Sequence, residues 1–149
     1  MVIKDTIKKL YKFYSIPYKL WGQDFDGCDC YGFIVLVYKE LFSIEIEQPT
    51  PSKIGKGTER RSNSIKPFFS PFKEVFSPQF MDVVLFLNEN GLPLHVGIYL
   101  EKEQVLNMSS EEGVHVIKLN DSRILSKNRY DKFAGFFRHE AFFQYPLLP

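Results

Sequence analysis

The sequence is poor in the features that define several large classes of protein. Its 149 residues include only two cysteines and one tryptophan, and its net charge is +1. A near-neutral charge does not favour nucleic-acid binding or a polybasic membrane anchor, so neither is expected. No apolar run approaches the roughly 20 residues of a transmembrane helix. The N-terminus also lacks an apolar stretch of signal-peptide length. We therefore expect a soluble chain that is cytoplasmic as synthesised.

The two cysteines, Cys28 and Cys30, are separated by a single residue. This spacing is too short to staple a fold, and no second Cys or His cluster completes a zinc site. We expect no metal and no other cofactor. The pair indicates either a reducing compartment or a reactive thiol.

Aromatic residues, in contrast, are abundant: 16% of the chain, with 15 Phe and 8 Tyr. They indicate a bulky core and are compatible with a cleft. The apolar share of 44% and the charged share of 25% are those of an ordinary globular protein. The length suits a single domain over residues 1–149 with one core.

The first half of the chain predicts two helices. Residues 2–14 carry apolar side chains at the three-to-four spacing of an amphipathic helix. Its lysines form a basic face that could contact an anionic polymer, although a solvated face is the simpler interpretation. After a loop over 15–29, residues 30–42 are apolar on almost every side, and their length favours a buried helix. The apolar face of the first helix consists of Ile3, Ile7, Leu10 and Tyr14.

The second half predicts a sheet. Residues 48–78 contain five prolines and are interpreted as a long excursion with one short helix. A short helix is also expected over 120–127. Helices followed by a meandering antiparallel sheet make an α+β domain. The predicted strands are 82–88, 94–101, 104–109, 114–119 and 133–138.

Cys30 is the stronger candidate nucleophile because it opens the predicted buried helix. The backbone N–H groups and the dipole at a helix start favour a thiolate, and the N–H of Cys30 itself is a candidate oxyanion donor. Cys28 lies in the loop without that position, so we expect it to titrate near the ordinary thiol value of about 8.5. The alternative for either cysteine is a small buried apolar residue.

Among the three histidines, His95 is the best placed to act as the base. It opens a strand, where strand ends face a cleft, and a base needs a rigid element. His115 lies in the middle of a strand and is expected at the surface. His139 follows the last strand, a terminal position that requires no functional explanation.

Asn107 is the candidate for the group that orients the imidazole of His95. If the turn between the two strands has three residues, Gly97 pairs with Asn107. Asn107 then shares a face with His95, diagonally across a glycine that leaves the space clear. A two-residue turn would place the two side chains on opposite faces, so the catalytic interpretation requires an odd-numbered turn or a bulge.

These residues together resemble the NlpC/p60 cell-wall cysteine peptidases. The resemblance covers about residues 11–138 and implies a papain-like α+β fold, with the nucleophile at the start of a helix that packs on an antiparallel sheet. Cys30 then matches the nucleophile, His95 the base, and Asn107 the third, orienting residue, which is most often His. The motifs are Pro17-Tyr18, Gly22, Gly27, Asp29-Cys30, Gly32, Asp82-Val83-Val84-Leu85-Phe86 and His95-Val96-Gly97-Ile98-Tyr99-Leu100.

The resemblance also implies two substrate-binding residues. Tyr18 matches the tyrosine that lines the active site, and its alternative is packing against the cleft wall. Asp29 matches the acidic residue that helps to hold the amine end of the substrate, and its alternative is a helix N-cap. Three positions depart from the family pattern: Tyr31 stands where Ser is usual, Met81 stands where Gly precedes Asp, and Cys28 replaces a bulky residue.

The resemblance implies hydrolysis of peptide bonds in peptidoglycan stem peptides, typically between γ-D-glutamate and diaminopimelate. The long helix, the Pro-rich linking chain and the ending Gly135-Phe136-Phe137-Arg138 look most like phage tail-associated members. We therefore expect tail proteins as partners and a virion-associated enzyme that acts at the cell wall. The alternatives are a structural component of a tail tip, or an acyltransferase or intracellular amidase on the same scaffold.

Overall fold

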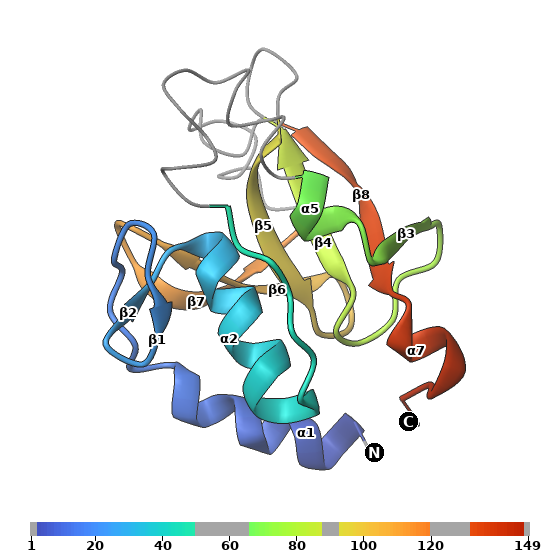
Figure 1. Ribbon diagram of the computed structural model, residues 1–149, viewed down its shortest axis with the longest axis horizontal. Helices are drawn as coiled ribbons and strands as arrows, with labels where there is room; N and C mark the ends of the chain where they lie inside the picture. The colour runs from blue at the N-terminus through green and yellow to red at the C-terminus, as the bar shows by residue number, and fades with distance from the viewer. Residues whose placement is uncertain (1–2, 50–65, 88–92, 120–131, 148–149) are drawn as a thin grey trace.

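The computed structural model describes residues 3–49, 66–87, 93–119 and 132–147. It has an α+β papain-like fold, as predicted, with helices packed on an antiparallel sheet (Figure 1). The helices are α1 (Ile3–Lys9), the 3₁₀ helix η1 (Leu10–Phe13), α2 (Cys30–Phe42), α5 (Lys66–Phe69) and α7 (Ala141–Gln144). The strands are β1 (Gln23–Asp24), β2 (Gly27–Cys28), β3 (Phe72–Val75), β4 (Val83–Leu87), β5 (Pro93–Tyr99), β6 (Gln104–Ser109), β7 (Gly113–Lys118) and β8 (Lys132–His139).

The main sheet has the order β3-β8-β4-β5-β6-β7. The predicted meander is confirmed for β4 to β7, and β8 returns to pair with the other edge of β4. The predicted helix over 120–127 and most of the Pro-rich excursion lie outside the described residues. Strand β3 was not predicted. It is a four-residue segment between prolines that pairs with β8, so its structure depends on a partner far along the chain.

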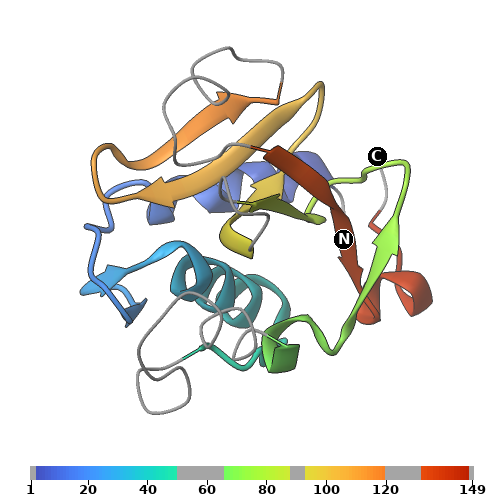
Figure 2. The ribbon, with the colours of Figure 1, turned by 90° about the horizontal axis from the view of Figure 1, so that it is seen from above.

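Helix α2 forms over the predicted residues and is the central element of the core. Every side chain from Cys30 to Tyr38 is buried, and the helix packs against β5 and β6. Burying a large apolar side chain contributes roughly 1.5–3 kcal/mol, so this run is a main source of stability. The helix ends at Ser43, whose left-handed conformation (φ 55°) breaks it. Seen from above, α2 lies across from β6 and β7, with β3 and β8 to one side (Figure 2).

The N-terminal helix is shorter than predicted. The α-helical part ends at Lys9 and continues as one 3₁₀ turn to Phe13. A 3₁₀ helix has three residues per turn, so Leu10 and Phe13 lie one above the other, and both are buried. Tyr14 is 40% exposed, so the prediction that it belongs to the apolar face was wrong.

The turn between β5 and β6 has the register that the catalytic interpretation requires. The N–H of Leu100 donates to the carbonyl of Gln104 at 2.9 Å. The N–H of Gln104 donates to the carbonyl of Glu101, also at 2.9 Å, so two residues of one strand face one of the other. The ladder pairs Ile98 with Leu106 and Tyr99 with Val105, and this register places Gly97 opposite Asn107. The predicted pairing is confirmed.

Candidate active site

The candidate nucleophile stands at the first residue of α2. Its predecessor Asp29 has extended backbone angles (φ −91°, ψ −172°), and its side chain accepts a hydrogen bond from the N–H of Gly32, the geometry of an N-cap. Cys30 is 8% exposed. The thiol therefore lies where the positive end of a 13-residue helix stabilises negative charge.

Asp29 is buried, with 2% of its surface exposed, and its carboxylate is held by N–H donors. The amide of Gly32 donates to Oδ1 at 2.8 Å, and the amide of Trp21 donates to Oδ2 at 3.0 Å. The side-chain amide of Gln48 donates to Oδ1 at 3.1 Å. This geometry is that of a helix cap. Contact of Asp29 with the substrate stays a prediction.

His95 and Asn107 are in direct contact. Nε2 of His95 lies 3.0 Å from Oδ1 of Asn107, and both residues are buried, with 6% and 0% exposure. A Cβ on Gly97 would lie 2.5 Å from Cγ1 of Val105 and 3.3 Å from Cβ of Asn107. A side chain at position 97 would therefore disturb the approach between the two residues, and glycine leaves it clear.

A second hydrogen bond sets the orientation of Asn107. Its Nδ2 donates to the backbone carbonyl of His115 at 3.1 Å, so Oδ1 is the atom that faces His95. Because an amide oxygen only accepts, the ring must donate from Nε2. This tautomer makes Nδ1 the accepting nitrogen of His95, as a base requires. Sequence reasoning did not identify the role of the His115 carbonyl.

The strands that carry His95 and Asn107 pack against the helix that begins at Cys30. Cys30 belongs to the same buried cluster as Val96 and Ile98. His95 alternates with these residues along β5, so its side chain points to the opposite face of the strand, where it contacts Phe86 of a second buried cluster with 5.7 Å between ring centroids. Contact between His95 and Cys30 stays a prediction.

Cys28 differs sharply from Cys30. It is fully buried, and its Sγ donates to the carbonyl of Asp24 at 3.1 Å. Burial, followed by the charges of Asp29 and Asp24, raises the pKa of Cys28 to about 12. The expectation that this thiol titrates near the ordinary value was therefore wrong. The sequence pattern did not indicate that Cys28 would lie in a buried two-residue strand.

Tyr18 lies beside this segment and is 38% exposed. Its backbone forms an isolated bridge with Cys28, and the neighbouring Lys19 donates its N–H to the carbonyl of Cys28 at 2.9 Å. Tyr18 thus lies beside Cys28, two residues before the start of α2. Its role in lining the substrate site stays a prediction.

The other two histidines have structural partners. Nδ1 of His115 lies 2.9 Å from the carbonyl of Gly113, and its Nε2 lies 3.4 Å from Glu112. His139 is 6% exposed, packs against Tyr38 and Phe72, and accepts a hydrogen bond from an amide of α7 through Nδ1. His139 is thus part of the core, a position that the sequence pattern did not indicate.

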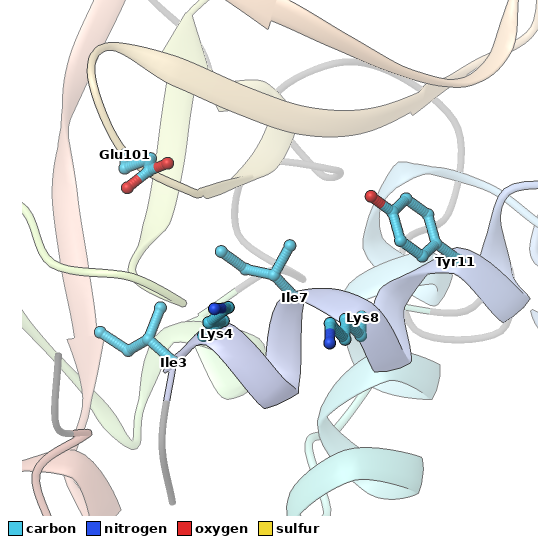
Figure 3. Close-up of a pocket in the computed structure, with 6 residues that line it drawn as sticks. All are labelled: Ile3, Lys4, Ile7, Lys8, Tyr11 and Glu101. Atoms are coloured by element: carbon cyan, nitrogen blue, oxygen red, sulfur yellow. The ribbon is translucent and has the colours of Figure 1, made fainter.

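A groove of about 480 Å³ lies apart from these residues. Figure 3 shows Ile3, Ile7 and Tyr11 on the side of the N-terminal helix that faces Glu101. Glu101 follows the end of β5, whereas His95 lies near its start. The groove is therefore separate from the candidate active site.

The described residues contain no cluster of three or more His, Cys, Asp or Glu side chains that could hold a metal ion. In the same ranges, no helix is both long enough and apolar enough to span a membrane.

The fold, with helices packed on an antiparallel sheet, is that of the papain-like class. The model of the NlpC/P60 family matches residues 15–132, and the chain belongs to this family. "Probable endopeptidase NlpC" of Escherichia coli strain K12 is 28% identical over 113 residues, which cover 76% of this chain and 66% of that protein. "Probable peptidoglycan endopeptidase LytE" of Bacillus subtilis strain 168 is 30% identical over 106 residues, which cover 71% of this chain and 27% of that protein. The chain thus spans less than two thirds of the length of these relatives.

Solved structures of the family have the same fold. The NlpC/p60 domain of the peptidoglycan hydrolase SagA has a TM-score of 0.54 at 25% identity, with 80% of this chain and 91% of that chain covered. A family protein from Bacillus cereus has a TM-score of 0.65 at 22% identity, with coverage of 93% and 40%. RipD from Mycobacterium tuberculosis, described as a non-catalytic domain, has a TM-score of 0.58 at 16% identity, with coverage of 92% and 96%. The fold alone therefore does not establish catalysis, which depends on the side chains of the site, because a non-catalytic protein has the same fold.

Proposed function

We propose that this chain is a cysteine endopeptidase or amidase that hydrolyses peptide bonds in peptidoglycan stem peptides. The observation that carries the proposal is the hydrogen bond from His95 to Asn107, because it gives the ring the tautomer of a base. Cys30 supplies the nucleophile at the start of α2, the helix that packs against the strands of His95 and Asn107. Both relatives above are named as endopeptidases, and the name of LytE supplies the substrate class, peptidoglycan.

In the proposed reaction, Nδ1 of His95 takes the proton of the Cys30 thiol. The thiolate sulfur then attacks the carbonyl carbon of the scissile amide. The resulting oxyanion accepts a hydrogen bond from the backbone N–H of Cys30. When the C–N bond breaks, His95 returns its proton to the leaving amine. A water molecule, deprotonated by the same nitrogen, then hydrolyses the thioester and restores the thiol.

The direct test is incubation of the protein with purified peptidoglycan, followed by mass spectrometry of newly freed amines. We expect release by the wild type and by Cys28→Ala, provided that the latter remains folded. Cys30→Ala should release none. Equal release by wild type and Cys30→Ala would contradict the proposal, because the products would then come from a contaminant or from a site that does not use this thiol.

The same experiment also tests the finer predictions from the family resemblance. Cleavage between γ-D-glutamate and diaminopimelate predicts a free diaminopimelate amine. Transfer of the acyl group to an added amine, without hydrolysis, would indicate the acyltransferase alternative. Binding to peptidoglycan without any product would indicate the structural one. Delivery by a phage tail stays a prediction.

A further inference from the structure

Gln48 is a buried polar residue in the chain that follows α2. It is 5% exposed and lies outside any helix or strand, in the stretch between the end of α2 and residue 50. A buried side-chain amide is retained when it makes hydrogen bonds that the fold needs. Its partners therefore indicate why glutamine stands at this position.

Both partners of the Gln48 amide nitrogen belong to the segment before the nucleophile. Nε2 donates to Oδ1 of Asp29 at 3.1 Å and to the backbone carbonyl of Gly22 at 3.2 Å. Because both partners only accept, the amide cannot be turned the other way. Within the described part of the chain, its Oε1 is buried and has no hydrogen-bond partner. A buried acceptor without a partner destabilises the fold, and an apolar residue of the same length would avoid that cost. The position therefore uses glutamine for its donor.

The backbone is closely packed around the Gln48 amide. A Cβ on Gly32, in the first turn of α2, would lie 1.7 Å from the carbonyl oxygen of Gly22 and 2.9 Å from Nε2 of Gln48. The N–H of Asp29 also donates to the Gly22 carbonyl, at 3.3 Å. The loop, the cap and the first helical turn thus meet at the Gln48 amide.

Gln48 also differs from the other donors to Asp29 in its place along the chain. The amides of Gly32 and Trp21 are three and eight residues from Asp29, whereas Gln48 is 19 residues away. These two donors belong to the loop and to the first helical turn, whereas Gln48 ties the cap to the segment beyond the helix. Its partial positive charge also offsets the buried carboxylate next to the thiol.

We infer that Gln48 is a positioning residue for Cys30: it holds the Asp29 cap and the Gly22 loop in place and offsets the negative charge beside the thiol. The inference rests on the proposed function only where it predicts an effect on catalysis. The contacts themselves predict an effect on the Cys30 thiol that can be measured without any substrate.

The test measures the rate of Cys30 alkylation by iodoacetamide as a function of pH, with the labelled peptide identified by mass spectrometry. Gln48→Met removes the donor and keeps the length. Gln48→Glu puts a second carboxylate beside Asp29. Gln23→Glu makes the same substitution at an exposed position in the neighbouring hairpin and is the matched control. Thermal melting of each variant checks folding.

We expect the midpoint of the alkylation profile to rise in the order wild type, Gln48→Met, Gln48→Glu. Added negative charge makes the thiolate harder to form, and a shift of about one pH unit is expected for Gln48→Glu. The control should stay close to wild type. In the hydrolysis assay, Gln48→Met should lower kcat more than it raises KM, because the substrate still binds while the thiol is less well placed.

Identical midpoints for wild type and both Gln48 variants would overturn the inference and leave Gln48 as a space-filling residue. If Gln48→Glu fails to fold, Gln48→Met decides alone, since it adds no charge. A protein that shows these shifts but cuts no peptidoglycan would refute the proposed function and retain the inference.

Discussion

Replacement of Asn107 tests the link between the sheet register and the candidate chemistry most directly. Asn107→Leu keeps the approximate size of the side chain but removes both hydrogen bonds, the one to His95 at 3.0 Å and the one to the His115 carbonyl at 3.1 Å. Asn107→Asp keeps an acceptor for His95. The second oxygen of the new carboxylate, however, faces the His115 carbonyl, which loses its donor and meets another acceptor. The two variants therefore separate orientation of the ring from stability of the strand pair.

The expected magnitudes follow from these contacts. In Asn107→Leu the carbonyl of His115 loses its side-chain donor, a loss of about 1–3 kcal/mol. This corresponds to a fall in Tm of about 2–12 °C for a domain of this size. The imidazolium of the reaction loses a hydrogen bond worth about 1.5–3 kcal/mol, so kcat should fall about 10- to 160-fold.

Asn107→Asp should be less stable than wild type yet more active than Asn107→Leu. The carboxylate favours the protonated ring, so the alkylation of Cys30 should extend to lower pH than in wild type. The assays are release of amines from peptidoglycan, alkylation against pH and thermal melting. A folded Asn107→Leu variant with the wild-type kcat would refute the reasoning, because the ring would then be oriented by another group.

Three further outcomes are expected. Alkylation between pH 6 and 9 should label Cys30 but leave Cys28 unmodified in the native protein, because burial and nearby carboxylates raise the pKa of Cys28 to about 12. An intact mass that shows both thiols labelled would contradict the burial of Cys28. Arg138→Met should lower the free energy of unfolding by about 3–5 kcal/mol, since Arg138 pairs with the buried Asp82 at 2.9 and 2.8 Å. In denaturant melts, the double variant with Asp82→Asn should recover part of this loss. No recovery would exclude the unpaired buried carboxylate as its cause. Burial lowers the pKa of His139 below its ordinary value of about 6.5. The folded state should therefore lose stability as the pH falls from about 6.5 towards this lower pKa, because the unfolded chain takes up the proton first. Thermal melts of His139→Gln should depend less on pH in this range, and an unchanged dependence would assign it to other groups.

The sequence alone was sufficient for the features that depend on neighbouring residues. The continuous apolar run predicted α2 over the residues that form it. Counting residues from Leu100 to Gln104 predicted that a three-residue turn would pair Gly97 with Asn107, and the structure decided between this turn and a two-residue one. That pairing placed His95 and Asn107 on one face, because alternation along a strand leaves only two possibilities.

The tertiary structure alone decided the features that depend on contacts between distant segments. Strand β3 exists because β8 pairs with it, and a four-residue segment has no periodicity long enough to detect. Cys28 and His139 have ordinary local sequences, and their burial comes from the packing around them. Gln48 lies in a stretch whose prolines and polar residues predicted only an irregular excursion, because its partners lie 19 and 26 residues earlier. Local patterns determined which elements form, and the packing of distant elements determined which polar side chains meet.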